Sequence, residues 1–133
     1  MSQENVEVVR ATFDAWNAGD MQRLGELYDP QAVMRFFPDA PEGGEPVVGR
    51  DNIIRAYGQL RDAWGATDRI VVLSEYLTAG DRVLVRVTLE AEGAGPAVSW
   101  EATIIWTLRG GRVFEIEFVA DHDEALEAVG LRE

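Results

Sequence analysis

Apolar residues in the first part of the chain recur three or four positions apart. The residues with this spacing are Val6, Val9, Phe13 and Trp16. Such a period places their side chains along one face of a helix. Ser2 can cap that helix at its start, and Gly19 suits the left-handed position that follows a helix end. We therefore predict a first helix between Ser2 and Gly19.

The rest of the first half also reads as helical, with one short extended segment. Asp20 can cap a second helix over residues 21–28, which Asp29-Pro30 would end because the residue before a proline disfavours helical geometry. The remaining predictions for this half are an extended segment over residues 33–37, a loop rich in Pro, Gly and Glu over residues 38–49, and a third helix over residues 51–64.

Alternating and apolar runs in the second half predict strands. The predicted strands are residues 70–77, 82–92, 97–108 and 113–119. Arg109-Gly110-Gly111-Arg112 is typical of a tight hairpin turn, and a short helix over residues 121–129 follows the last strand. This order predicts an α+β fold over residues 1–133, with three N-terminal helices on one face of a curved, mainly antiparallel sheet.

The net charge of the chain limits the classes of partner that it can bind. Its 133 residues include 24 acidic and 12 basic side chains, for a net charge of −12 at pH 7. Nucleic acids and anionic membranes repel such a surface, so both are excluded as partners. The N-terminus is polar and acidic, unlike a signal peptide, and no apolar run reaches the roughly 18 residues of a membrane helix. The expected location is the cytoplasm.

Missing residue types exclude several kinds of chemistry. All 12 basic residues are arginine, so no lysine amine is present for Schiff-base chemistry. The absence of cysteine excludes thiol nucleophiles, disulfides and thiolate metal sites. His122 is the single histidine, and its neighbours in Asp121-His122-Asp123 do not face one ion from a helix start. We therefore expect neither a metal nor a cofactor.

Several short segments together resemble one superfamily. They are residues 4–10 (ENVEVVR), 16–20 (WNAGD), 48–51 (VGRD), 79–83 (AGDRV), 106–113 (WTLRGGRV) and 124–131 (EALEAVGL). With the order of elements, they resemble the nuclear transport factor 2-like superfamily, and most closely its SnoaL-like (polyketide cyclase-like) branch. The resemblance implies a single cone-shaped SnoaL-like domain, a cavity between the helices and the concave sheet face, and a homodimer. It does not define one activity, because this fold hosts many unrelated ones.

At the positions where the steroid isomerase relatives carry acids and bases, this chain carries other types of residue. By the resemblance, their tyrosine falls near Thr12, their general base at Phe36, and their protonated aspartate near Ile104. Phe36 and Ile104 carry no group that can move a proton. We therefore predict that steroid double-bond isomerisation stays near its uncatalysed rate. The polyketide cyclase relatives also place an acid at this position, which falls on Ile104 or, with a shift of one residue, on Thr103. Neither is an acid, so their usual chemistry loses support.

Arg86 is the one residue that matches the epoxide hydrolase relatives. Their arginine falls on Arg86, but their two aspartates fall on Thr88 and Phe118. An arginine without flanking carboxylates does not activate water, although it can hold a carboxylate or carbonyl of a ligand. The alternative is a strand arginine that faces solvent or pairs with Glu75 or Glu101.

Two functional hypotheses concern a pocket, and a third does not. The first is a protein that binds a small apolar or polycyclic molecule, with catalysis left open. The second is an isomerase, cyclase or hydrolase with an unusual acid–base set, for which the candidates are Arg86, Tyr57 and His122. For His122, a solvated helix start is the alternative. The third is a non-catalytic dimerisation module. The predicted pocket residues are Trp16, Met34, Phe36, Tyr57, Trp64, Arg86, Trp100, Ile104, Trp106 and Phe118.

The expected homodimer depends on which face of the second long strand is inside. If Arg86 faces the cavity, alternation turns Val83, Val85 and Val87 outward. An exposed valine row would form a large apolar patch, which a twofold copy of the chain could cover. We therefore predict a homodimer formed through the outer sheet face.

Overall fold

The first helix begins and ends where the sequence predicts, and the second helix begins there. In the computed structural model, which describes residues 2–36, 45–64, 69–72, 76–91 and 98–119, α1 spans Ser2–Ala18 and α2 spans Met21–Glu26. Gly19 separates them at φ 73°, a left-handed conformation that glycine adopts without strain. The Asp20 side chain accepts a hydrogen bond from the Arg23 backbone N–H at 3.0 Å and caps α2.

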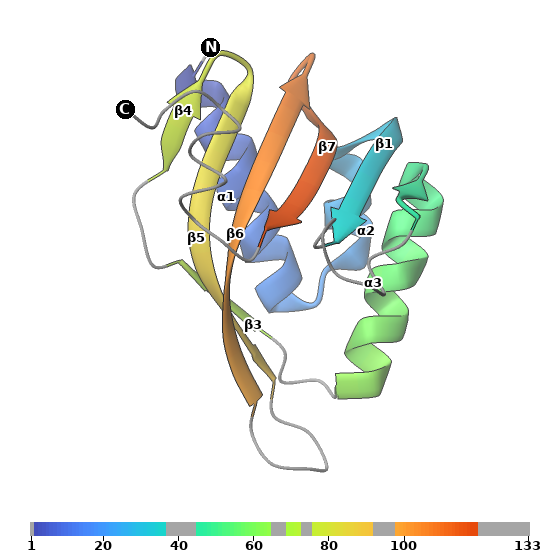
Figure 1. Cartoon of the computed structure of the whole chain (residues 1–133). Coiled ribbons are helices and arrows are strands. Elements are labelled where there is room, and N and C mark those ends of the chain that lie inside the picture. The colour runs from blue at the N-terminus through green and yellow to red at the C-terminus, as the bar shows by residue number, and fades with distance from the viewer. Residues whose placement is uncertain (1, 37–44, 65–68, 73–75, 92–97, 120–133) are drawn as a thin grey trace.

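A seven-stranded sheet forms the second layer (Figure 1). Its strands are β1 (Tyr28–Phe36), β2 (Val47–Val48), β3 (Arg69–Val72), β4 (Leu77–Ala79), β5 (Arg82–Ala91), β6 (Val98–Arg109) and β7 (Arg112–Val119). The order across the sheet is β2-β1-β7-β6-β5-β3, and β4 also pairs with β5. All the pairs are antiparallel except that of β1 with β7, which is parallel. The predicted α+β class, with helices on a mainly antiparallel sheet, is confirmed.

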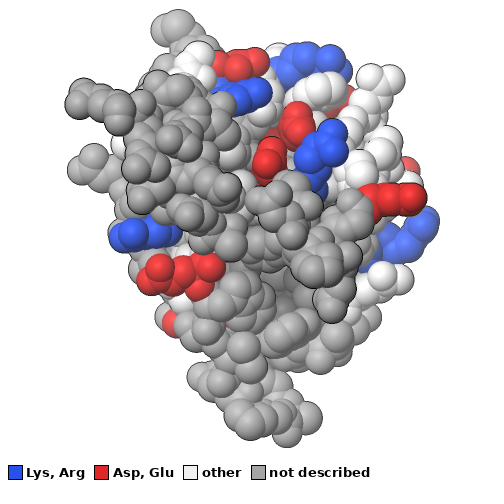
Figure 2. Space-filling model, in the orientation of Figure 1, with Lys and Arg blue, Asp and Glu red and all other residues white. Residues whose placement is uncertain are grey.

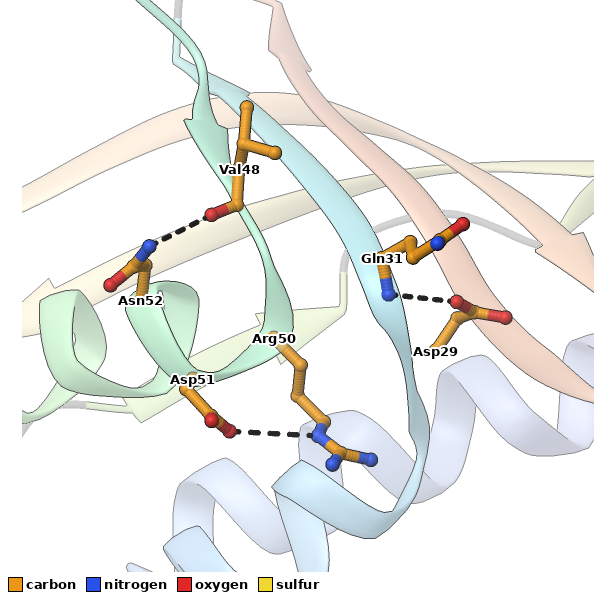
Figure 3. Close-up of polar contacts among 6 residues, drawn as sticks. All are labelled: Asp29, Gln31, Val48, Arg50, Asp51 and Asn52. Atoms are coloured by element: carbon orange, nitrogen blue, oxygen red, sulfur yellow. Dashed lines mark hydrogen bonds and ion pairs between the residues drawn. The ribbon is translucent and has the colours of Figure 1, made fainter.

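The end of the second helix differs from the prediction. Residues 28–30 lie at the start of β1 and not at the end of α2. The Val113 backbone N–H donates to the Leu27 carbonyl at 2.9 Å, so the chain pairs with β7 as soon as α2 ends. The register of β1 shifts between Tyr28 and Val33, and this irregular stretch accommodates Pro30, which has no N–H to donate to a ladder. The Asp29 side chain accepts from the Gln31 backbone N–H at 2.8 Å (Figure 3).

Arg109 fixes the start of β1 to the β6–β7 hairpin. Its guanidinium lies 3.8 Å from the centre of the Phe114 ring and 3.5 Å from the Asp29 carboxylate. The pKa of Asp29 is held below its usual value, chiefly by the hydrogen bond from Gln31 and further by the charge of Arg109. These contacts fix the backbone next to Tyr28, whose side chain is fully buried in the core.

The other predicted elements are found with small changes. The strands predicted over residues 82–92, 97–108 and 113–119 correspond to β5, β6 and β7. The strand predicted over residues 70–77 is seen as two shorter strands, β3 and β4, which pair with different parts of β5. Most of the predicted loop over residues 38–49, and all of the helix predicted over residues 121–129, lie outside the described residues.

The third helix, α3 (Arg50–Trp64), is anchored to the edge of the sheet (Figure 3). The Gly49 backbone N–H donates to the Ala32 carbonyl of β1 at 2.8 Å, and Gly49 has φ 96°. The Asn52 side chain donates to the Val48 carbonyl at 2.9 Å. At the same end, Arg50 and Asp51 form an ion pair at 3.8 Å. Because β2 pairs with β1, these contacts fix the direction in which α3 crosses the sheet.

The valine row of β5 faces the helices. Val83, Val85 and Val87 are fully buried and pack in the main core cluster with residues of α1, α2 and α3. On the opposite face, Leu84 packs with Ile105 in a separate small cluster. The prediction that the valine row faces outward is therefore wrong. The helices need an apolar sheet face to cover, and the row of valines supplies it.

Candidate functional site

Three aromatic side chains meet between α1, α3 and the start of β1. The rings of Trp16 and Tyr57 lie 5.2 Å apart at 78°, and those of Tyr28 and Tyr57 lie 6.2 Å apart at 85°. Both are edge-to-face arrangements, which aromatic pairs favour. All three side chains belong to the main core cluster. Tyr57 therefore sits at the centre of the group and is held by contacts from two other elements.

The hydroxyl groups of Tyr28 and Tyr57 are hydrogen bonded at 2.9 Å inside this cluster. One hydroxyl donates and the other accepts, so one phenolic proton is left, and no acceptor for it is found among the described residues. Burial raises the pKa of both tyrosines, and for Tyr28 the neighbouring Tyr57 raises it further. Both phenols are therefore neutral hydrogen-bonding groups at physiological pH.

A second aromatic group lies between α1 and the middle of the sheet. Phe13 and Trp106 are edge to face, with ring centres 5.5 Å apart at 81°. Tyr76 lies 6.5 Å from Phe13, and the Arg10 guanidinium lies 5.1 Å from the centre of the Tyr76 ring. Trp106 is 3% exposed, and no described residue accepts a hydrogen bond from its Nε1. The group thus combines apolar packing with one unmet polar donor.

Six of the ten residues predicted to line a pocket pack in the same core cluster. They are Trp16, Met34, Tyr57, Ile104, Trp106 and Phe118. Ile104 and Phe118 are direct register partners on β6 and β7, and Met34 of β1 is the partner of Ile116. The sheet thus brings β1, which is distant in sequence, beside the β6–β7 hairpin, and the three strands form one wall opposite α1 and α3. For Phe36, Trp64 and Trp100 only the backbone is described, and His122 lies outside the described residues.

Arg86 is not part of this wall. It lies between Val85 and Val87 on β5 and opposite Thr103 on β6. Since both valines pack against the helices, alternation turns Arg86 to the other face of the sheet, where Leu84 and Ile105 lie. Arg86 therefore lies outside the cluster that the helices cover, which is where the pocket is predicted. The outward valine patch on which the predicted homodimer was based is therefore not present.

Tyr28 is a site residue that the sequence analysis missed. It was assigned to the end of the second helix, where its side chain had no defined partner. The signal that was available is weak: a short helix with a cap at Asp20 can end before Tyr28 and release it to a strand. Thr12, in contrast, is buried, and its hydroxyl donates to the Val9 carbonyl of its own helix at 2.6 Å. That donor is therefore already used.

The carboxylates of the described residues stay out of the core. Every described carboxylate is exposed or half-buried, and no group of three potential metal ligands occurs in the described ranges. On the face seen in Figure 2, described arginines and carboxylates are interspersed. Arg35 of β1 and Glu115 of β7 form an ion pair at 3.0 Å. The core cluster therefore offers neutral donors and aromatic faces to a ligand.

The buried tyrosine pair predicts a loss of stability in alkali. An unfolded tyrosine ionises near pH 10, whereas Tyr28 and Tyr57 keep their protons to higher pH in the folded protein. Above about pH 10 the folded state then binds more protons than the unfolded state. The contribution of the two tyrosines to the free energy of unfolding is therefore constant below that pH and falls above it. Urea unfolding from pH 8 to pH 12 measures this. The Tyr28→Phe/Tyr57→Phe double variant should show a weaker fall, and an unchanged fall would contradict the assignment.

Comparison with known proteins identifies relatives of the whole fold. The family profile of the SnoaL-like domain matches residues 9–116. No curated protein matches the sequence. Within the described residues, no helix is both long enough and apolar enough to cross a membrane.

Three solved structures illustrate the likeness. Bal32a, from a soil-derived mobile gene cassette, is 29% identical with a TM-score of 0.77, over 87% of this chain and 88% of that one. A nuclear transport factor 2-like protein of unknown function from Burkholderia pseudomallei is 22% identical with a TM-score of 0.74, over 95% and 97% of the two chains. TerC, co-crystallised with polyporic acid, is 21% identical with a TM-score of 0.74, also over 95% and 97%.

Proposed function

The chain belongs to the SnoaL-like family, and on that premise we propose that it binds a small, largely apolar molecule between α1, α3 and the helix-facing side of the sheet. The observation that carries this proposal is the Tyr28–Tyr57 hydroxyl pair, placed at 2.9 Å within an aromatic cluster. Small-molecule sites are typically apolar and aromatic with a few polar groups that fix orientation. TerC, which shares the fold, was co-crystallised with polyporic acid.

The neutral character of the cluster favours binding over acid–base catalysis. Its members are apolar or aromatic side chains, and the tyrosine hydroxyls are its titratable groups. A raised pKa makes a phenol a poor proton acceptor at neutral pH but leaves it a good hydrogen-bond donor. Of the candidate catalytic residues, Arg86 lies on the other face and His122 is outside the described residues.

A second candidate function follows from the same tyrosine pair. A buried phenol with a spare proton can stabilise a negative charge that develops on a ligand oxygen. Tyr57 could then support an isomerase, cyclase or hydrolase reaction with a base supplied from outside the described residues. Binding comes first in either case, so a binding experiment decides whether the site exists.

Adjacent isoleucines on β6 provide a matched test of this site. Ile104 is fully buried in the main cluster, and Ile105 is 5% exposed on the opposite face. Ile104→Phe should weaken binding of the neutral fluorescent probe N-phenyl-1-naphthylamine about tenfold or more, which is a loss of about 1.4 kcal/mol, because the larger ring occupies the ligand's place. Ile105→Phe should leave the affinity unchanged. Fluorescence titration of the full chain measures both.

The stability of the same two variants separates a pocket from a solid core. Overpacking a filled core typically costs about 1–3 kcal/mol. If space for a ligand adjoins Ile104, Ile104→Phe should cost less than Ile105→Phe in urea unfolding. Equal probe affinities for both variants, or no probe binding by the unmodified protein, would refute the proposed site and favour a module that uses the fold for contacts alone.

The homodimer belongs to this proposal as well. Its support is now the family likeness, since the valine row is covered by the helices. Sedimentation at micromolar concentration should give about twice the chain mass of 14.7 kDa. A species that stays at the chain mass at low and high salt would rule the dimer out.

A further inference from the structure

The indole N–H of Trp106 is a buried donor that lacks a partner. The side chain is 3% exposed, and its Nε1 is buried with no acceptor among the described residues. Buried polar groups in folded proteins are nearly always hydrogen bonded, because an unmet donor destabilises the fold. An acceptor from outside the described residues would therefore stabilise this buried donor.

The surroundings of Trp106 explain why the protein offers no acceptor. Its register partners are Val83 on β5 and Ile116 on β7, which are both fully buried and apolar. The ring of Phe13 on α1 lies edge to face with the indole. The backbone carbonyls of the neighbouring strands are engaged in the antiparallel ladders on both sides. An aromatic face is a weak acceptor at best, so Phe13 is the competing explanation that a test must address.

The tyrosine pair adds a donor to the cluster, and the cluster carries no charge. The Thr12 hydroxyl already donates to the Val9 carbonyl. The Tyr28–Tyr57 pair uses one phenolic proton in its own hydrogen bond and has a second one to donate. No arginine belongs to the cluster, so an anionic ligand would lack a buried counter-charge. The net charge of −12 also repels anions from the whole protein. The site therefore suits a ligand with neutral acceptor atoms on an aromatic body.

We infer that the ligand is a neutral aromatic ketone or quinone whose carbonyl oxygen accepts a hydrogen bond from Trp106 Nε1, an inference that rests on the proposed function. The aromatic skeleton packs between α1 and the sheet, where Phe13 and Ile104 supply apolar contact. The carbonyl satisfies the indole donor. Trp106 is thus the residue that selects oxygenated ligands over hydrocarbons of the same shape.

Two compounds of nearly identical shape test this selection. 9-Fluorenone carries a carbonyl where fluorene carries a methylene group, and the rings are otherwise the same. Calorimetric titration of the full chain should show fluorenone binding about tenfold more tightly, as expected for one buried hydrogen bond to a donor that is otherwise unmet. Trp106→Phe keeps an aromatic ring but removes the N–H, so the two compounds should bind that variant equally. Ile105→Val, a neighbouring change on the opposite sheet face, should keep the tenfold preference.

Nuclear magnetic resonance gives a readout that does not depend on the variant folding. The Trp106 indole cross-peak, identified by its absence from the spectrum of Trp106→Phe or by sequential assignment of the unmodified chain, should move downfield with fluorenone and not with fluorene. Equal affinities of the native chain for both compounds, a preference that survives in Trp106→Phe, or an unmoved cross-peak would each overturn the inference. Binding of N-phenyl-1-naphthylamine without binding of fluorenone would overturn this inference and leave the proposed function in place. Failure of every apolar compound to bind would overturn the proposed function.

Discussion

Val85→Asp is expected to prevent the chain from folding at neutral pH. Val85 is fully buried at the centre of the valine row of β5, in contact with the cluster that α1, α2 and α3 cover. A carboxylate placed there would have no buried cation to pair with, since no described arginine belongs to that cluster. Burying an unpaired charge costs an amount comparable with the whole stability of a domain, about 5–15 kcal/mol. Circular dichroism with urea should show no cooperative unfolding transition.

Val48 provides the matched control for this prediction. It lies on β2 at the edge of the sheet and is 58% exposed, so Val48→Asp makes the same chemical change in water. Its effect on the free energy of unfolding should stay within about 0.5 kcal/mol. If instead Val85→Asp folds with nearly the stability of the unmodified chain, the valine row faces outward and Arg86 returns to the cavity side.

Removing either hydroxyl of the tyrosine pair should cost about 1–3 kcal/mol of unfolding free energy. Tyr28→Phe leaves the Tyr57 hydroxyl buried without its bond, and Tyr57→Phe does the same to Tyr28. The double variant removes both polar groups at once, so it should cost clearly less than the sum of the single variants. Urea unfolding of the four proteins gives this coupling energy directly.

The third tyrosine serves as the control for the cycle. Tyr76 is half-buried, and no hydrogen bond of its hydroxyl is seen among the described residues. Tyr76→Phe should change the free energy of unfolding by no more than about 0.5 kcal/mol. Strictly additive costs for Tyr28→Phe and Tyr57→Phe would mean that the two hydroxyls do not stabilise each other.

The helices and long strands were predicted well because caps, turn glycines and residue periodicity lie within each element or next to it. Gly19 and Asp20 mark the boundary between α1 and α2, and the structure shows both in the expected roles. The long strands β5, β6 and β7 lie within one or two residues of the predicted ranges. The parallel pairing of β1 with β7 was not predicted, because it joins segments far apart in the sequence and leaves no periodic signal in either of them.

The inner and outer faces of the sheet were harder to predict. Both faces of β5 carry apolar residues, with Val85 on one and Leu84 on the other, so alternation alone defines two faces without saying which the helices cover. The sequence left two placements of Arg86 open, and the one that followed the family position would have turned the valine row outward, whereas the structure buries that row under the helices. Trp106 was predicted to line a pocket from its residue type and position alone. Its unmet donor depends on three elements that meet around it, so no local sequence pattern could indicate it.

The parallel pair of β1 and β7 has a consequence for the order in which the protein can fold during synthesis. Two ion pairs connect β1 to the β6–β7 hairpin, Arg35–Glu115 and Asp29–Arg109. In each pair the two residues lie 80 positions apart in the sequence. The N-terminal helices leave the ribosome long before the strands they cover, so their apolar faces have no sheet to pack on until nearly the whole chain has emerged. Folding is therefore expected to be late and to depend on closing long loops, which slows it relative to proteins with local contacts. Chains released before β7 is complete would expose the core face of α1 and become substrates for chaperones.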